Sequence, residues 1–293
     1  MRILITGSNG LLGQKIVRQL LNSKDAFLAT SLGANRNNAC PSDHYCAMDI
    51  TNQADIERVM KEFQPSHVIH TAAMTNVDAC ELDPTTCESI NVDAVRYLAH
   101  ACQKIGVHFQ MLSTDFVFDG EKGNYSEEDE PNPLSVYATS KVEGEKIVSS
   151  LANLSYSIVR TIIVYGTGQN LSRSNIVLWA KDALQKGQEL TIIDDQFRAP
   201  TWADDLAWAC IRICRLNEQG IFHIAGPETM SIFALVERIA KHYHLPMSQV
   251  KRTDSSTLNQ PAVRPPKTGF DLSKAKNILG YRPKSLEETL DLV

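Results

Sequence analysis

A tyrosine and a lysine four residues apart, Tyr137 and Lys141, form the pair in this sequence best suited to proton transfer. Free tyrosine has a pKa of about 10 and is a poor acid at neutral pH. On a helix, a lysine one turn later lies on the same face, so its charge favours the phenolate and lowers the tyrosine pKa. Because desolvation alone would raise that pKa, we expect the lysine charge, together with the positive charge of an oxidised redox cofactor, to dominate. Tyr137 could then exchange a proton with a carbonyl or an alcohol.

A hydroxyl that could orient the same carbonyl lies upstream of this pair. Thr114 follows the apolar run Phe109–Ser113, where it would end a central strand. From that position its hydroxyl can bond the oxygen that Tyr137 protonates. Because Tyr-x-x-x-Lys pairs are common in amphipathic helices, Thr114 makes the pattern specific. Asp115 comes next and is expected either to line the pocket or to cap a loop.

A glycine-rich segment near the N-terminus predicts a pyrophosphate site. Gly7, Gly10 and Gly13 follow the apolar run Ile3–Ile5 and open a helical pattern at 11–21. Gly7 permits a tight turn, Gly10 lets the backbone approach phosphate oxygens, and Gly13 lets the helix pack on the strand. The helix N-terminus supplies free N–H groups and partial positive charge. Although the spacing is GxxGxxG rather than GxGxxG, its place between strand and helix predicts dinucleotide binding, and with the proton-transfer pair it predicts nicotinamide redox chemistry.

The preferred nicotinamide depends on the end of the second strand. NAD specificity usually needs an acid there to bond the ribose 2′-hydroxyl. No Asp or Glu lies between Phe27 and Ser42, whereas Arg36 does. The anionic 2′-phosphate of NADPH tolerates the absence of an acid and the presence of Arg36 better than the 2′-hydroxyl of NADH does, so we expect NADPH over NADH. Alternatively, Arg36 is a solvated loop cation. Asp49, before Ile50, could accept a bond from the adenine amine or else cap a helix.

Alternating strand and helix patterns predict the fold class. Strands are expected at 2–6, 27–31, 45–48, 67–71, 109–113 and 157–164, and helices at 11–21, 53–62, 87–102 and 136–149. Short, uninterrupted apolar strands in βαβ order are typical of a parallel sheet with helices on both faces. Right-handed crossovers make this an α/β, Rossmann-type doubly wound sheet.

The rhythm changes after Gly166, which indicates a smaller C-terminal lobe. Helices are expected at 175–185, 203–215, 231–242 and 286–292, and strands at 191–193 and 221–224. We expect a dinucleotide-binding Rossmann domain over 1–165, rejoined by 203–225. A substrate-binding lobe over 166–202 and 226–293 would close over the mouth of the sheet, where ligands of open α/β folds bind.

Composition argues against several other classes. The 293 residues are 43% hydrophobic and 22% charged, as in ordinary globular proteins, and the net charge of -5 disfavours nucleic acid or anionic membrane as partner. No apolar stretch approaches the roughly 20 residues of a membrane span, and a strand from Arg2 leaves no room for a signal segment. Seven cysteines without a CxxC pair suggest reduced thiols in a cytoplasmic protein, and no metal site is expected. A homodimer is left open.

With these motifs, the sequence resembles the extended short-chain dehydrogenase/reductase superfamily and, within it, the dTDP-4-dehydrorhamnose reductases. The Ser-Thr-Asp-Phe-Val-Phe-Asp-Gly run at 113–120 and the Pro-Thr-x-Ala-Asp-Asp-Leu run at 200–206 are the most discriminating segments. Other matching segments are 3–13, 49–51, 71–73, 90–91, 137–141, 160–161, 164–166, 195–197, 264–265 and Leu272.

This resemblance implies specific site residues. Thr114, Tyr137 and Lys141 would be the catalytic set, with Lys141 also holding the nicotinamide ribose. The expected cofactor-binding residues are Gly7, Asn9, Gly10, Leu11, Leu12, Gly13, Arg36, Asp49, Ile50, Ala72, Ala73, Tyr137 and Lys141. The expected substrate-binding residues are Thr114, Asp115, Phe116, Gln196 and Arg198. Arg198, absent from the usual family pattern, would bind substrate phosphate or else be a surface arginine.

A second departure from the family leaves the sugar open. The family usually has Ser-Trp before Val-Tyr-Gly, with the tryptophan facing the sugar, whereas this chain has Ile162 and Ile163. The leading expectation is NAD(P)H-dependent reduction of a nucleotide-linked 4-keto-deoxysugar, dTDP-4-dehydro-L-rhamnose giving dTDP-L-rhamnose. One alternative is an epimerase or dehydratase of the same fold, although a dehydratase commonly has Asp-Glu where this chain has Asp115 and Phe116. The other is a non-catalytic subunit like the regulatory subunit of methionine adenosyltransferase.

Overall fold

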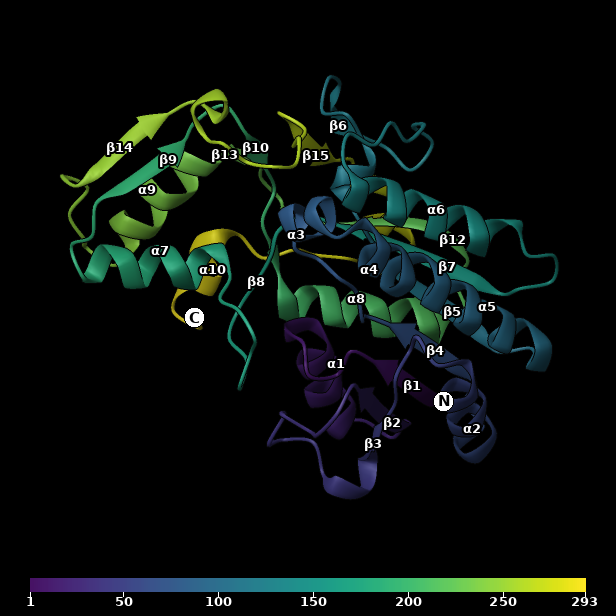
Figure 1. Ribbon diagram of the computed structural model, residues 1–293. Coiled ribbons are helices and arrows are strands. Elements are labelled where there is room, and N and C mark those ends of the chain that lie inside the picture. Colours follow the sequence, from purple (N-terminus) through teal and green to yellow (C-terminus); the bar gives the residue numbers. More distant parts are fainter.

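Seven parallel strands form the central sheet of the computed structural model, which describes residues 1–293 (Figure 1). Their order across the sheet is β12-β7-β5-β4-β1-β2-β3. Their bounds are β1 (Arg2–Thr6), β2 (Ala26–Ser31), β3 (Tyr45–Ala47), β4 (His67–His70), β5 (His108–Thr114), β7 (Tyr156–Thr161) and β12 (Gly220–Ile224). The order reverses between β1 and β4, and such a reversal opens a crevice at the carboxyl ends of the strands. The predicted doubly wound sheet is confirmed.

Helices cover both faces of this sheet. On one face α1 (Leu11–Leu21) packs against α8 (Ala203–Leu216), and their apolar residues share one core with β1 and β7. On the other face α2 (Gln53–Phe63), α5 (Ala94–Ile105) and α6 (Val136–Ser150) enclose a second core. Each of these cores buries the apolar stripe of amphipathic helices against β-branched strand residues.

A smaller lobe stands beside the sheet, at the upper left of Figure 1. It contains α7 (Ile176–Gln185), β9 (Leu190–Ile193), β10 (Phe197–Arg198), β13 (Met230–Ser231), α9 (Ile232–His242), β14 (Val250–Thr253) and α10 (Leu286–Leu290). Strand β9 pairs with β14 in parallel, and β10 pairs with β13 in antiparallel. The lobe has its own core, in which α7, α9 and α10 meet. A parallel pair of β8 (Val164–Tyr165) and β11 (Thr201–Trp202) lies where the lobe joins the sheet domain.

The C-terminal segment crosses back to the sheet domain, which differs from our expectation of one lobe over 226–293. Strand β15 (Thr268–Phe270) pairs with β6 (Gly123–Tyr125). Leu272, Leu279 and Tyr281 are buried in the same core as α1 and α8. Such a return depends on contacts between residues far apart in sequence, and no local pattern encodes it.

Two predicted elements are interrupted in the structure. The helix expected at 87–102 consists of α4 (Pro84–Glu88), a π-helical turn (Ser89–Asp93) and α5, and it follows a short unpredicted helix α3 (Val77–Leu82). At the π-helical turn the Asn91 amide donates to the Met74 carbonyl and accepts from the Met74 N–H. The strand expected at 157–164 ends at Thr161, because Ile163 adopts a φ of 31° that a β-ladder cannot contain.

The structure contains neither a membrane-spanning helix nor a cluster of metal-binding side chains. No helix has the length and apolar character needed to cross a membrane. No group of three or more His, Cys, Asp or Glu side chains is arranged to hold a metal ion.

Candidate active site

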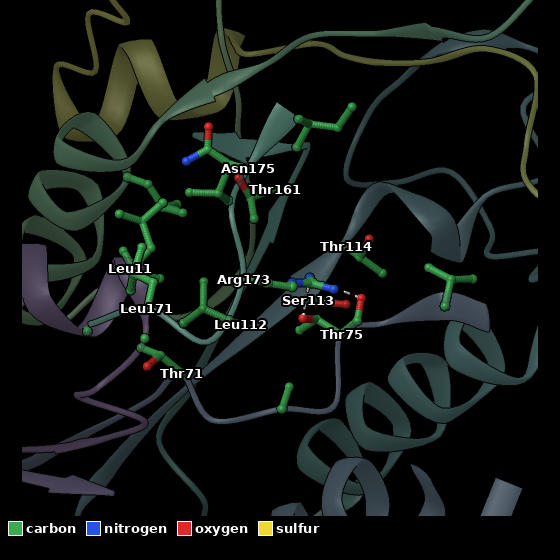
Figure 2. A pocket seen from close by; sticks show the side chains of 18 of the residues that line it. Leu11, Thr71, Thr75, Leu112, Ser113, Thr114, Thr161, Leu171, Arg173 and Asn175 are labelled. Atoms are coloured by element: carbon green, nitrogen blue, oxygen red, sulfur yellow. Dashed lines mark hydrogen bonds between the residues drawn. The ribbon is translucent and has the colours of Figure 1, made fainter. Parts of the chain in front are cut away.

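A cavity of about 640 Å³ lies at the carboxyl ends of the central strands (Figure 2). Five groups of residues line most of it: the start of α1, the segment after β4, the end of β5 with the start of α6, the segment from the end of β7 to β8, and a loop that leads into α7. Those lining residues include Asn9 to Gly13, Thr71, Ala73, Thr75, Ser113 to Phe116, Tyr137, Lys141 and Leu171 to Ile176. The expected phosphate site and the expected proton-transfer residues therefore face one space.

The phosphate end of the cavity is built by closely packed glycines. Gly7 has a φ of +71°, and a Cβ on it would lie 2.6 Å from the Ala72 amide nitrogen. A Cβ on Gly13 would lie 2.5 Å from the Gly7 carbonyl oxygen, so only glycine lets α1 start this close to β1.

The start of α1 fits an anion. Gly10 is the N-cap and provides no side-chain cap, and the first turn contains no acidic residue. The Gln14 amide is the first to bond back into the helix, to the Gly10 carbonyl at 3.0 Å. The three preceding N–H groups are therefore open to an anion at the cavity wall. This arrangement fits the pyrophosphate of a dinucleotide.

The proton-transfer residues meet at the other end of the cavity. Tyr137 and Lys141 lie one turn apart on α6, which Ser135 caps by accepting a bond from the Ala138 amide at 3.3 Å. Thr114 ends β5, lines the same cavity as Tyr137, and donates its hydroxyl to Asp115 Oδ1 at 3.1 Å. Beside it, the buried Ser113 hydroxyl has no protein partner and lines the cavity, as a group reserved for a ligand would.

Burial, and not the Lys141 charge, dominates the acidity of Tyr137 in the protein alone. Only 8% of Tyr137 is exposed, and this desolvation raises its pKa far above the usual range, against a hydrogen bond from Thr114 and the charge of Arg173. Burial also lowers the pKa of Lys141 to about 8, although the Glu145 carboxylate opposes this shift. Desolvation therefore outweighs the nearby charges for both groups in the protein without cofactor, and the combined effect of Lys141 and an oxidised nicotinamide on Tyr137 stays a prediction.

Arg198 is neither a surface residue nor a lining residue. Its side chain is 2% exposed, and its Nε lies 3.5 Å from Asp115 Oδ2. Its Nη2 donates to the Pro265 carbonyl at 2.6 Å, and its Nη1 donates to Phe197 and Pro266 carbonyls. The guanidinium thus holds the C-terminal segment against the site, which corrects the alternative of a surface arginine.

Asp115 and its neighbours differ in their access to the cavity. Asp115 and Phe116 line it, and Asp115 accepts hydrogen bonds from the hydroxyls of Thr114 and Thr268. Burial raises the pKa of Asp115, against the Arg198 charge. Gln196 is buried outside the cavity, where its carbonyl accepts a bond from the Ile232 amide. Its predicted contact with substrate therefore has no direct support in this conformation.

Several expected cofactor residues lie beyond the cavity walls. Gly7 and Ala72 form the packed layer behind the phosphate loop. The Asp49 carboxylate accepts bonds from the Thr51 amide and hydroxyl at 2.9 and 2.7 Å, so it closes a turn in which Ile50 lies. The expected helix cap at Asp49 is wrong, because Asn52 is the N-cap of α2. Arg36 is exposed, and its backbone amide donates to Asn9 Oδ1 at 2.8 Å, which fastens its backbone to the phosphate loop.

The loop at residues 167–175, hereafter the strap, contains residues that the sequence did not indicate. Figure 2 shows Arg173 extending across the cavity toward Thr75, to which its Nη2 donates at 2.7 Å. Leu171 and Asn175 line the same wall. No motif or periodicity marks these positions, and only the fold brings them to the α6 residues.

The RmlD substrate binding domain family matches the whole chain, residues 1–293. The chain belongs to this family. It is 32% identical to the dTDP-4-dehydrorhamnose reductase of Streptomyces griseus, over 94% of this chain and 87% of the relative. It is 31% identical to methionine adenosyltransferase 2 subunit beta of Bos taurus, over 96% and 84%. A solved dTDP-4-dehydrorhamnose reductase of Bacillus anthracis, in complex with NADP, superimposes with a TM-score of 0.85 at 27% identity, over 99% of this chain and 97% of that one.

In this RmlD family member the site combines an open helix N-terminus with a buried tyrosine phenol. The α1 N-terminus can hold a pyrophosphate, while Tyr137, Thr114 and Ser113 present hydroxyl groups at the opposite end. The cavity lining extends from Asn9, after β1, to Thr161, at the end of β7, with β4 and β5 between these two strands, so a dinucleotide and a second ligand can meet in it. Such an arrangement can combine hydride transfer with proton transfer to an oxygen.

Proposed function

We propose that this protein reduces the 4-keto group of a nucleotide-linked deoxysugar, with dTDP-4-dehydro-L-rhamnose as substrate and dTDP-L-rhamnose as product. The protein is an NAD(P)H-dependent oxidoreductase, as its membership of the RmlD family and its relatives among reductases support. The observation that carries the proposal is the convergence of Tyr137, Lys141 and Thr114 on the cavity that the α1 phosphate loop opens.

A bound nicotinamide would supply the hydride that reaches the carbonyl carbon. The free amides of α1 would hold its pyrophosphate, and the Lys141 ammonium would hold its ribose hydroxyls. Thr114 would bond the substrate oxygen and orient it beside the phenol. Tyr137 would then donate its proton to that oxygen as negative charge develops there.

The smaller lobe is the proposed substrate-binding unit. Its strap and the start of α7 line the cavity opposite α1, so a nucleotide-sugar would lie between them and the sheet. Ile163 lines this cavity where the family usually carries tryptophan, which leaves an apolar but less extended wall for the sugar. A deoxysugar presents the apolar methyl group that suits such a wall.

The alternatives make different predictions. A dehydratase normally needs an acid-base pair beside Thr114, commonly Asp-Glu, but this chain has Phe116 in place of the glutamate, and Asp115 is engaged by Arg198 and Thr268. An epimerase would retain its nicotinamide through purification. A regulatory subunit, as the similarity to the Bos taurus protein suggests, would bind the dinucleotide without turning over any 4-keto sugar.

Absorbance loss on mixing the protein with NADPH and a panel of nucleotide-linked 4-keto sugars tests the proposal. Tyr137→Phe should reduce turnover by at least ~100-fold, the scale of general acid catalysis, while NADPH affinity persists. Tyr97→Phe, on the half-exposed surface of α5 away from the cavity, is the matched control and should keep full activity. Turnover by Tyr137→Phe at the wild-type rate would remove the assigned proton donor.

A further inference from the structure

Arg198 joins the smaller lobe, the end of β5 and the C-terminal segment at one buried point beside the active site. Its Nε lies 3.5 Å from Asp115 Oδ2, and its Nη2 donates to the Pro265 carbonyl at 2.6 Å. Its Nη1 donates to the Phe197 and Pro266 carbonyls at 2.7 and 3.3 Å. Because the carbonyls carry no net charge, Asp115 is the anion that compensates this buried cation.

The Asp115 carboxylate accepts hydrogen bonds on both of its oxygens. Oδ1 accepts from the Thr114 hydroxyl at 3.1 Å, and Oδ2 accepts from the Thr268 hydroxyl of β15. Hydrogen bonds and a cation at this distance favour the ionised form of a carboxyl group. Burial raises the pKa of Asp115, and the Arg198 charge opposes that rise. The cation therefore supports the charge that the hydroxyl groups bind.

The direction of the Thr114 hydroxyl follows from these bonds. A threonine hydroxyl has one proton to donate, and Thr114 donates it to Asp115. Its oxygen also accepts from the Phe116 amide at 3.2 Å. One lone pair of Thr114 Oγ1 is left, at the wall of the cavity that Tyr137 also lines (Figure 2). That lone pair fits the hydroxyl group into which the proposed reaction converts the 4-keto oxygen.

The other titratable groups near Asp115 and Arg198 form no hydrogen bond or ion pair with the carboxylate. They are the phenol of Tyr137, the ammonium group of Lys141 and the guanidinium groups of Arg173 and Arg264. Tyr137 is neutral, because burial raises its pKa far above the usual range. Arg264 is paired with Asp78 at 2.7 Å. Arg198 is thus the cation on which the ionisation of Asp115 depends.

We propose that Arg198 is a positioning residue of the proton-transfer site, which keeps Asp115 ionised so that its carboxylate holds the Thr114 hydroxyl in place. Arg198 does not line the cavity and acts only through Asp115. Without the cation, Asp115 takes up a proton, and a neutral carboxyl group binds the Thr114 hydroxyl less strongly than a carboxylate does. The catalytic consequence rests on the proposed function, whereas the ionisation of Asp115 does not.

The pH dependence of thermal unfolding tests this ionisation without substrate or cofactor. Arg198→Met should raise the pKa of Asp115 in the folded protein by about one unit or more, because a nearby opposite charge lowers a carboxyl pKa by roughly 1–3 units. A raised folded-state pKa means that stability is present at low pH and is lost as pH rises towards that pKa. Between about pH 5 and about pH 9, the melting temperature of the variant should therefore fall further and further below that of the parent.

Two further variants separate this effect from loss of packing. Adding Asp115→Asn to Arg198→Met removes the carboxyl group, so the additional loss at high pH should disappear. Arg212→Met is the matched control, because Arg212 of α8 also donates to a carbonyl of the C-terminal segment, that of Leu279 at 3.4 Å. Arg212 forms no ion pair, and its variant should show the parental pH dependence.

A loss of melting temperature in Arg198→Met that is equal at every pH would overturn the proposal. If Arg198→Met does not fold at high pH, the double variant with Asp115→Asn should still fold, since it leaves no charge unpaired. Failure of both variants to fold would also overturn the proposal, because Arg198 would then act through the Pro265 and Pro266 carbonyls alone.

Kinetics test the catalytic consequence. Where the parent reduces a 4-keto sugar, the pH below which kcat declines should rise by about one unit or more in Arg198→Met, with the KM for NADPH unchanged. Arg198→Lys keeps the cation and should restore most of this shift. A kcat lowered equally at every pH would indicate a merely structural role and overturn the proposal. Absence of turnover by the parent protein would count against the proposed function alone.

Discussion

A buried ion pair on the catalytic helix offers the sharpest test of how this scaffold supports its site. Glu145 lies one turn after Lys141 on α6 and accepts from Arg160 of β7 twice, Nε to Oε1 at 3.0 Å and Nη2 to Oε2 at 2.6 Å. Their side chains are 7% and 2% exposed. Glu145→Gln preserves the shape of the side chain but leaves the Arg160 guanidinium in the protein interior without an anion.

The expected loss is large because the remaining charge cannot regain its hydration. Removing one partner of a buried pair typically costs about 3–5 kcal/mol. At roughly 2 cal/mol/K of unfolding entropy per residue, a chain of this length has an unfolding entropy of about 0.6 kcal/mol/K. A loss of ~4 kcal/mol therefore corresponds to a melting temperature lower by about 6 to 7 °C. The variant should also depress the pKa of Lys141 further, since the Glu145 charge is what opposes its desolvation.

Thermal melts followed by circular dichroism measure this effect. The matched control is Asp182→Asn, which breaks an exposed pair with Lys186 whose side chains are 60% and 59% exposed. That control should cost less than ~1 kcal/mol, because solvent screens the pair. The double variant Glu145→Met with Arg160→Met should recover most of the loss, since it leaves no unpaired charge. A melting temperature for Glu145→Gln equal to that of Asp182→Asn would refute the reasoning.

Three further predictions follow from the site. Gly13→Ala should weaken NADPH binding at least ~10-fold and destabilise the fold by about 1–3 kcal/mol, because the added Cβ would lie 2.5 Å from the Gly7 carbonyl oxygen. A fluorescence titration in which the variant binds NADPH with the parental affinity would contradict this prediction. Lys141→Met should stabilise the protein by roughly 3 kcal/mol at pH 7. Burial lowers the pKa of the Lys141 ammonium in the folded protein to about 8, so the folded protein holds this proton less tightly than the unfolded chain does. The stability gained by Lys141→Met should shrink as pH rises from 8 towards 10.5. Denaturant melts that show a pH-independent gain in stability would contradict this prediction. The catalytic efficiency with NADPH should exceed that with NADH, and Arg36→Ala should reduce the difference between the two. Equal efficiencies with both cofactors in the parent protein would refute a role for Arg36 in 2′-phosphate binding.

Local patterns were enough to predict the architecture and the chemistry of this chain. The apolar run of β1, the glycines that follow it and the 3.6-residue periodicity of α1 specify one βα unit, because steric limits at Gly7 and Gly13 act over short distances. The pairing of Tyr137 with Lys141 follows from helix geometry in the same way. Short-range sterics and hydrogen bonding thus made it possible to predict the fold class, and the placing of Tyr137 and Lys141 on one helix, from the order of the residues.

Properties that sum over many distant neighbours were decided only when the chain folded. The acidity of Tyr137 depends on how completely the surrounding elements exclude water, and burial raises its pKa in the protein without cofactor. Arg198 carried no pattern that distinguishes a surface cation from one enclosed by the 265–266 carbonyls. Arg173 reaches the site because the strap is fastened to α1, a contact spanning more than half of the chain. Solvation and long-range packing depend on three-dimensional proximity, which sequence separation does not determine.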